Sequence, residues 1–216
     1  MKHIVVTCKG NIGRSPVAEL VGHQYLQSVG ADKEYVLSSS GTMTDAVLKG
    51  LRTPAEMETS MTIFTASGLH HSSFDLYRQA LQKGRTEETQ KYAIEAMAHC
   101  VESEMNKRDS ILRELRVEGT PKRRPEQMVP RDDVDYILAV DRKVYDDVTK
   151  SPGGIYYGRQ RMPVINVLSV FATGNPEERD AEVDLRDPQS VWNSYRKSIE
   201  RIIEHTPLAL QKIISA

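Results

Sequence analysis

The chain has 216 residues, of which 39% are hydrophobic and 27% charged, with 29 basic against 30 acidic side chains. This length fits one domain or one domain with an insertion, and the balanced charge argues against broad electrostatic capture of nucleic acid. Two cysteines, Cys8 and Cys100, exclude a disulfide scaffold and a cysteine-rich zinc module. Because no apolar run approaches ~18 residues and no signal-peptide pattern opens the chain, we expect a soluble cytoplasmic protein without a membrane partner.

The predicted elements alternate between short strands and helices. Four apolar runs predict strands: 3–7, 35–39, 134–140 and 163–170. After the first run, Ser15 as N-cap and Pro16 at the first helical position predict a helix that ends near Gly30. A last amphipathic helix is expected from Gln189 until Pro207 interrupts it. This alternation predicts an α/β fold, with a doubly wound four-stranded parallel sheet and helices on both faces.

Residues 75–130 interrupt this alternation, because they contain no strand pattern. Apolar residues at helical spacing mark one or two long, highly charged helices there: Ile94, Met97, Val101, Met105, Leu112 and Leu115. We therefore predict a single domain over 1–216 with a helical insertion at 75–130. The apolar stripe is a packing face, either onto the sheet or against a second copy of the chain in a homodimer.

The loop after the first strand carries the chemistry. Cys8 and Arg14 form a Cys-x5-Arg pattern between a buried strand and a helix N-terminus, where backbone N–H groups and the helix dipole attract an anion. We expect Cys8 to favour the nucleophilic thiolate there, and Arg14 to grip two oxygens of a phosphoryl group. Ser15 can donate a hydrogen bond that eases departure of the thiolate. Three loop residues suit tight or left-handed turns: Gly10, Asn11 and Gly13.

A nucleotide-binding loop is the less favoured interpretation of the same residues. The pattern Gly-x4-Gly-Lys-Ser/Thr fits Cys8 to Ser15 only with Cys in place of the first Gly and Arg in place of the Lys that reaches the terminal phosphates. Only Asp141 follows a hydrophobic strand in a position to hold magnesium. The pairs His70-His71 and His99-Cys100 lack ligand spacing, so we predict neither a metal site nor a cofactor.

The stretch from Val6 to Glu19 resembles the active-site loop of the low-molecular-weight protein tyrosine phosphatase family. Fainter similarities follow in chain order at Ser40-Gly41-Thr42, at 135–142 and at Asp187-Pro188. The phosphate-binding loop that the resemblance implies comprises Lys9, Gly10, Asn11, Ile12, Gly13, Arg14 and Ser15.

The resemblance also implies a role for each chemical group. Cys8 would be the nucleophile and Arg14 the phosphate clamp. Asp187 would protonate the leaving phenolate and then activate water against the phosphocysteine, with Asp184 as the fallback candidate. Independently of the resemblance, Asp187 before Pro188 also fits a helix N-cap.

One further implied feature is a polar network that supports the loop. His70 or His71 is similar to the histidine that joins Ser40 and Asn11 in this network in the family.

The chain departs from the family pattern at three places. Gly13 stands where the family often has a second cysteine, so the redox switch that this cysteine provides should be absent. Gln189-Ser190 stand where tyrosines often form a wall of the cleft, a role that Tyr156-Tyr157 or the insertion could take over. Ile12 stands where arginine phosphatases tend to have threonine, which favours an aryl phosphate.

Together these residues imply a metal-independent phosphomonoesterase that acts on a phosphotyrosine protein or a small aryl phosphate. Two other classes use a similar loop. A thioredoxin-coupled arsenate reductase needs two further cysteines for its relay, whereas this chain has only Cys100 besides Cys8. A non-catalytic phosphate-binding module is the other alternative.

Overall fold

The computed structural model describes residues 1–150, 153–178, 180–185, 187 and 190–216. Its centre is a parallel sheet with the strand order β2-β1-β3-β4. The strands are β1 (Lys2–Cys8), β2 (Tyr35–Gly41), β3 (Tyr136–Ala139) and β4 (Val164–Val167). All four lie in apolar runs that the sequence predicts as strands, so the α/β class and the parallel sheet are confirmed. Since β2 and β3 flank β1 on opposite sides, Cys8 lies where the strand order reverses, which is the usual place for a ligand site in such sheets.

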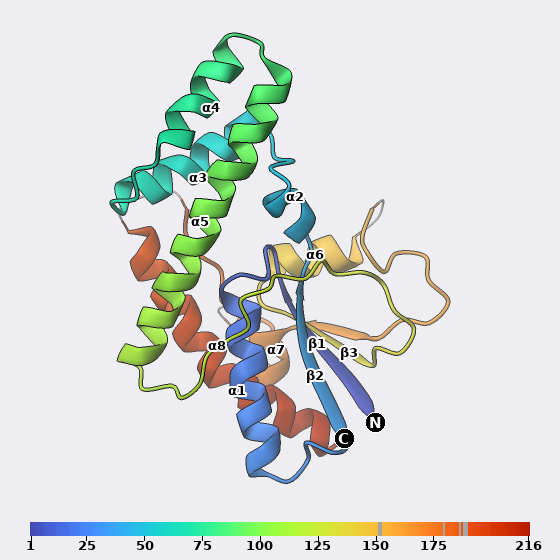
Figure 1. Ribbon diagram of the computed structural model, residues 1–216. Coiled ribbons are helices and arrows are strands. Elements are labelled where there is room, and N and C mark those ends of the chain that lie inside the picture. Colours follow the sequence, from blue (N-terminus) through green and yellow to red (C-terminus); the bar gives the residue numbers. More distant parts are fainter. Residues whose placement is uncertain (151–152, 179, 186, 188–189) are drawn as a thin grey trace.

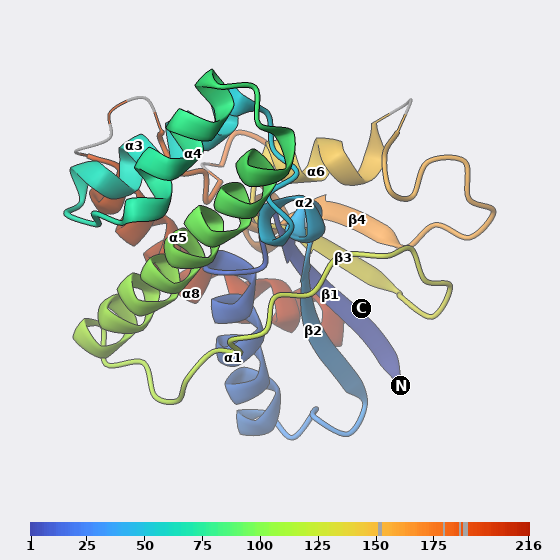
Figure 2. The ribbon, with the colours of Figure 1, turned by 45° about the horizontal axis from the view of Figure 1, so that its top comes forward.

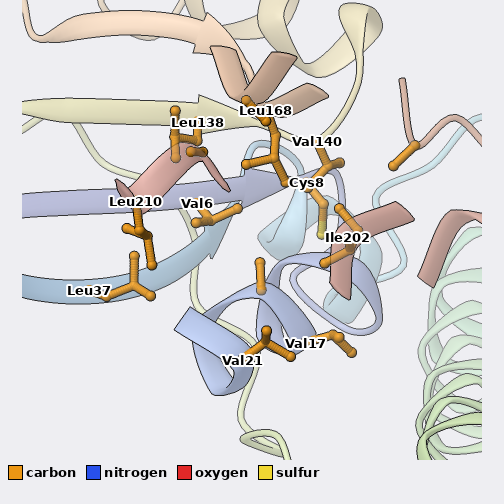
Figure 3. Packing of buried hydrophobic residues seen from close by; sticks show 14 of the residues in the cluster. Val6, Cys8, Val17, Val21, Leu37, Leu138, Val140, Leu168, Ile202 and Leu210 are labelled. Atoms are coloured by element: carbon orange, nitrogen blue, oxygen red, sulfur yellow. The ribbon is translucent and has the colours of Figure 1, made fainter. Parts of the chain in front are cut away.

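Helices cover both faces of the sheet (Figure 1). They are α1 (Arg14–Ser28), α2 (Thr44–Leu48), α3 (Pro54–Ala66), α4 (Ser72–Gln82), α5 (Thr86–Glu114), α6 (Arg142–Thr149), α7 (Leu168–Thr173) and α8 (Val191–Ile214). Alternate residues of β1 point to opposite faces, as the strand period requires. Ile4 and Val6 belong to the core shared with α1, α7 and α8, whereas Val5 packs with Val148 of α6 and Tyr156. Figure 3 shows Cys8 at the end of β1, beside the first of these cores.

The helical region between β2 and β3 begins earlier than residue 75, with α2 and α3, and its last helix ends at Glu114. We call residues 44–114 the helical arm. The arm stands beside the carboxyl end of β1 in both views of the ribbon (Figures 1 and 2). It has a hydrophobic core of its own, in which Met97 and Met105 of α5 pack against Met57 and Phe64 of α3. The apolar stripe expected in 75–130 is therefore used within the chain. None of the helices in the described part of the chain has the length and apolar character that crossing a membrane requires.

Two predicted helix boundaries were wrong. The first helix begins at Arg14 with Gly13 as N-cap, because the Ser15 hydroxyl donates to Cys8 Sγ instead of capping the helix. The last helix continues past Pro207 to Ile214, since its far end buries apolar side chains against α1. The predicted stop of the first helix is confirmed: Gly30 follows it in the left-handed conformation, with φ of 71°.

Candidate active site

The sulfur of Cys8 accepts two hydrogen bonds from its own loop. The backbone N–H of Asn11 lies 3.2 Å from Sγ, and the hydroxyl of Ser15 lies 3.0 Å from it. Both donors favour negative charge on the sulfur. The cysteine is only 3% exposed, at the carboxyl end of β1 and beside the N-terminus of α1. The structure thus brings together a thiol, two donors and a helix N-terminus, as an anion site requires.

Asn11 fixes the shape of this loop. It takes the left-handed conformation with φ of 51°, which asparagine tolerates better than most residues. Its side-chain Nδ2 donates to the hydroxyls of Ser15 at 3.0 Å and Ser39 at 2.9 Å, and its Oδ1 accepts from the backbone N–H of Glu126 at 2.8 Å. The Ser39 hydroxyl in turn donates to Glu19 at 2.6 Å. This buried network connects the loop to β2, α1 and the segment that follows the arm.

The family resemblance predicted other partners for Asn11, namely Ser40 and either His70 or His71. Ser40 turns its carbonyl toward Ser15 at 3.3 Å, but its buried hydroxyl has no hydrogen-bond partner among the described residues. Side chains alternate along a strand, so Ser39 and not Ser40 faces the loop from β2. His71 accepts a hydrogen bond from the backbone of Ser73 as the N-cap of α4, and its ring lies 3.4 Å from that of His99. His70 is exposed beside it. Both histidines therefore belong to the arm and not to the loop network.

Arg14 reaches from the loop toward β3. Its guanidinium donates to Asp141 Oδ2 at 2.5 Å and to the carbonyl of Ala181 at 2.9 Å. Asp141 also caps α6 by accepting from Val144 N–H, so its carboxylate is fixed in place. Burial lowers the pKa of Arg14, but the charges of Asp141, Cys8 and Glu104 outweigh burial and raise it. Arg14 and Cys8 line the same cavity, where a fixed cation can face an anion bound over the sulfur.

Sequence reasoning missed Arg108 on α5. This arginine is completely buried, and it donates to the carbonyl of Ile12 at 2.5 Å and to that of Lys122 at 3.3 Å. Its charge is balanced by Asp109 at 2.8 Å. A signal was present in the sequence, since position 108 continues the apolar helical series of Met105 and Leu112. A charged residue on a buried stripe needs partners.

The absence of a second loop cysteine has a steric reason. A Cβ atom on Gly13 would lie 1.9 Å from the hydroxyl oxygen of Tyr195 and 2.7 Å from Glu104 Oε1. Two side chains from α8 and α5 thus occupy the space where a longer side chain would begin. Burial raises the pKa of Glu104 and holds the pKa of Tyr195 well above its usual range.

The loop lies at one side of an open cavity whose other walls come from the arm, from α8 and the segment before it, and from Asp141 and Lys143 after β3. Phe64 and Trp192 meet edge to face with ring centres 5.5 Å apart, and both line this cavity. The aromatic wall therefore comes from α3 and α8. The alternative wall at Tyr156-Tyr157 was wrong, because Tyr156 is buried on the opposite face and accepts from Arg131 N–H, while Tyr157 is exposed.

Cys100, which lies in the predicted helical insertion, also lines this cavity. It is 1% exposed, and burial raises the pKa of its thiol to about 12. Such a thiol is almost entirely protonated near neutral pH and is a poor nucleophile. The described residues contain no cluster of three or more side chains suited to a metal ion.

Asp187 precedes α8, where its carbonyl accepts the backbone N–H groups of Ser190 and Val191, both at 3.1 Å. Leu185 and Val191, on either side of it in the sequence, line the cavity. Its expected partner in the motif, Pro188, lies outside the described residues, as does Gln189. The fallback residue Asp184 does not line the Cys8 cavity but lines a neighbouring pocket that shares Val183 and Leu185 with it, and its backbone N–H donates to the Ser194 hydroxyl. The general-acid role of Asp187 stays a prediction.

No protein-family model matches the chain, and no curated protein matches it. Solved structures do match. A protein tyrosine phosphatase from Entamoeba histolytica is 16% identical with a TM-score of 0.53, over 100% of this chain and 97% of that one. A low molecular weight protein tyrosine phosphatase from T. tengcongensis is 16% identical with a TM-score of 0.51, over 98% and 99%. The drosophila arginine phosphatase DARP is 16% identical with a TM-score of 0.50, over 99% and 98%. The chain thus has the fold of the low-molecular-weight protein tyrosine phosphatases, as the sequence predicts.

Proposed function

We propose that this protein is a phosphomonoester hydrolase that works through a phosphocysteine intermediate. The observation that carries the proposal is the sulfur of Cys8, held by Asn11 N–H and the Ser15 hydroxyl in a cavity that Arg14 also lines. The shared phosphatase fold supports it. The proposal includes a cytoplasmic location, since a nucleophilic thiol needs a reducing compartment.

In the first step, the Cys8 thiolate attacks phosphorus while the bond to the leaving oxygen breaks. Asp187 donates its proton to that oxygen, and Arg14 with the loop N–H groups stabilises the phosphoryl oxygens. In the second step, water attacks the phosphorus of the phosphocysteine and gives a proton to Asp187. The sulfur then leaves as a thiolate that the Ser15 hydroxyl stabilises, and inorganic phosphate is released.

The walls of the cavity favour an aryl leaving group, such as that of phosphotyrosine. Phe64 and Trp192 offer ring faces and edges, and Ile12 adds an apolar surface from the loop. These side chains can pack against an aromatic ring whose phosphate reaches Cys8. They offer fewer partners to the polar guanidinium of a phosphoarginine.

A paired assay on the wild type and Cys8→Ser tests this proposal. We expect the wild type to hydrolyse a phosphotyrosyl peptide and phenyl phosphate in the presence of a chelator, with inhibition by vanadate. Cys8→Ser should lose turnover. Hydrolysis at the wild-type rate by Cys8→Ser would refute the mechanism. Arsenate reduction with a thiol donor, without hydrolysis, would favour the reductase, and phosphate binding without either activity would favour a binding module.

The role of Asp187 needs a matched pair of variants. We expect Asp187→Asn to slow hydrolysis of phenyl phosphate by about a hundredfold, since general acids contribute roughly 10²–10⁴-fold. Asp184→Asn is the control and should retain the wild-type rate. If Asp184→Asn shows the larger loss, Asp184 is the acid.

A further inference from the structure

Arg52 is a cation in the cavity wall without an anionic partner in the described part of the chain. It lies in the segment between α2 and α3, is partly buried, and lines the cavity together with Cys8. One guanidinium nitrogen donates to the hydroxyl of Ser60 at 2.7 Å. Its Nε is buried without a hydrogen-bond partner, and no carboxylate among the described residues lies within ion-pair distance. A buried donor of a charged group costs free energy when it is unpaired, so this nitrogen points to an acceptor that a ligand supplies.

The nearby carboxylates are engaged elsewhere. Glu56 feels the charge of Arg52, but its oxygens accept from the backbone of Thr53 at 2.9 Å and the hydroxyl of Thr53 at 3.0 Å. These hydrogen bonds form the capping box of α3 and are the main reason why the pKa of Glu56 is lowered. Glu104 on α5 also feels the charge of Arg52, but its Oε1 lies beside Gly13 and it forms no ion pair with Arg52. Arg52 therefore has an uncharged partner, the hydroxyl of Ser60.

A second cation accompanies Arg52. Lys9, an exposed residue of the phosphate-binding loop, lines the cavity too, and its charge acts on the same Glu56 carboxylate as Arg52. In contrast, Arg14 is held on the sheet side by Asp141 and Ala181. Lys143, a fourth cation in the cavity wall, is paired with Glu182. Arg52 and Lys9 are therefore the cavity cations that have no ion pair among the described residues, so they can bind an anionic group of a ligand.

We propose that Arg52, with Lys9 beside it, binds a carboxylate of the substrate, so that the enzyme prefers a phosphotyrosine next to an acidic residue. This inference rests on the proposed function, because it assumes that the phosphoryl group of the substrate occupies the Cys8 loop. Arg52 is then a specificity-determining residue that the arm contributes. A guanidinium suits this task, since its planar fork can bind both oxygens of a carboxylate.

The test compares two pairs of substrates that differ by one negative charge: 3-carboxyphenyl phosphate with phenyl phosphate, and phosphotyrosyl peptides with Asp or Asn beside the phosphotyrosine. We expect the wild type to favour the acidic member by roughly tenfold or more in kcat/KM, mainly through KM, as a charge-assisted hydrogen bond allows. In Arg52→Gln this ratio should fall to near one. Arg78→Gln, which removes a partly exposed arginine of α4 paired with Glu58, should keep the wild-type ratio.

Three outcomes would overturn the inference. The wild type could show a kcat/KM ratio near one, or Arg52→Gln could keep the wild-type ratio. Arg52→Gln could also lose kcat/KM equally on the acidic and the neutral substrate of each pair. The last would mean that Arg52 holds the reacting phosphoryl group itself. Arg52→Lys keeps the positive charge but lacks the planar guanidinium, and it should retain part of the preference in kcat/KM. This variant serves as the test if Arg52→Gln fails to fold.

Measuring the binding of the same substrates to Cys8→Ser tests their relative affinities in the absence of turnover. Calorimetry with the same phenyl phosphates should show the same preference, lost in Cys8→Ser/Arg52→Gln. A binding preference without hydrolysis by the wild type would refute the proposed function but support the Arg52 site. Equal affinities, or no binding of either compound, would refute the Arg52 site.

Discussion

The two hydrogen bonds to Cys8 act at different stages of the proposed reaction. The Asn11 N–H belongs to the loop backbone and is held by the conformation of the loop, whereas the Ser15 hydroxyl can be removed by a single substitution. Removing it leaves the attack on phosphorus largely intact but destabilises the thiolate as it leaves the intermediate. The structure therefore allows the two steps to be separated.

Ser15→Ala should slow the second step selectively. We expect kcat to fall by about ten- to a hundredfold, because a hydrogen bond to a charged group contributes roughly 1.5–3 kcal/mol. Stopped-flow measurements with p-nitrophenyl phosphate should show a burst of phenolate as the phosphocysteine accumulates. Ser28→Ala, at the exposed end of the same helix, is the control. A burst rate reduced as much as kcat would show that the hydroxyl does not act specifically on the leaving thiolate.

Gly13 and Tyr195 should be coupled. The methyl group of Gly13→Ala would lie 1.9 Å from the Tyr195 hydroxyl oxygen, so the loop or α8 must shift, and we expect a lower melting temperature and lower activity. Tyr195→Phe removes that oxygen, and the double variant should recover part of both losses. A double-mutant cycle measures this coupling. Losses that simply add would mean that the Gly13 loop does not depend on the space beside Tyr195.

Helix α5 contributes more to the site than its charged sequence indicates. Five of its residues reach the cavity or the loop: Met97, Cys100, Val101, Glu104 and Arg108. Arg108 holds the carbonyl of Ile12 and so fixes the backbone that presents the loop N–H groups. We regard it as a positioning residue, since it contacts the loop and not the reacting atoms.

Replacing Arg108 tests this support. Arg108→Met breaks a buried ion pair and should lower the free energy of unfolding by about 3–5 kcal/mol. At temperatures where the variant is folded, vanadate should bind more weakly and KM should rise, and Arg108→Lys should restore part of both. Arg113→Met, an exposed residue of the same helix, should change neither. Normal vanadate affinity in folded Arg108→Met would restrict this residue to a role in stability.

The sequence predicts the elements whose physical causes are local. The strands follow from short β-branched runs, and the end of α1 follows from Gly30 with its positive φ. Tertiary packing decided what local patterns could not predict: α8 passes through Pro207 because its far end has apolar surface to bury. Likewise, Arg108 reaches the loop, and Ser39 takes the place expected for Ser40, through contacts between distant segments.

The described residues form three hydrophobic cores, and the single tryptophan of the chain lies where the core of the sheet shared with α8 meets the core of the arm. Trp192 packs against both the core of the sheet and the core of the arm, and it lines the cavity as well. The active cavity is thus formed by docking of the arm onto the sheet. It follows that charged groups enclosed at this junction, above all Glu104, affect the stability of the entire fold.

Stability should therefore depend on pH through Glu104. Burial raises its pKa in the folded protein, although Arg14, Tyr195, Arg108 and Arg52 lower it in part. Above the ordinary pKa of glutamate, about 4.3, the unfolded chain releases this proton while the folded chain retains it. The folded state then binds more protons, so the free energy of unfolding falls as pH rises, until the pKa of the folded state is passed. Below both pKa values, this contribution vanishes.

Glu104→Gln should abolish this dependence. In urea denaturation, the stability of Glu104→Gln relative to the wild type should increase as pH rises above about 4 and should level off once the pKa of Glu104 in the folded state is passed. Glu102→Gln, exposed on the same helix, should differ from the wild type by a constant amount. A difference for Glu104→Gln that stays constant or shrinks as pH rises would mean that Arg14 and Arg108 stabilise the carboxylate more than burial disfavours it. In that case Glu104 would be a structural ion-pair partner.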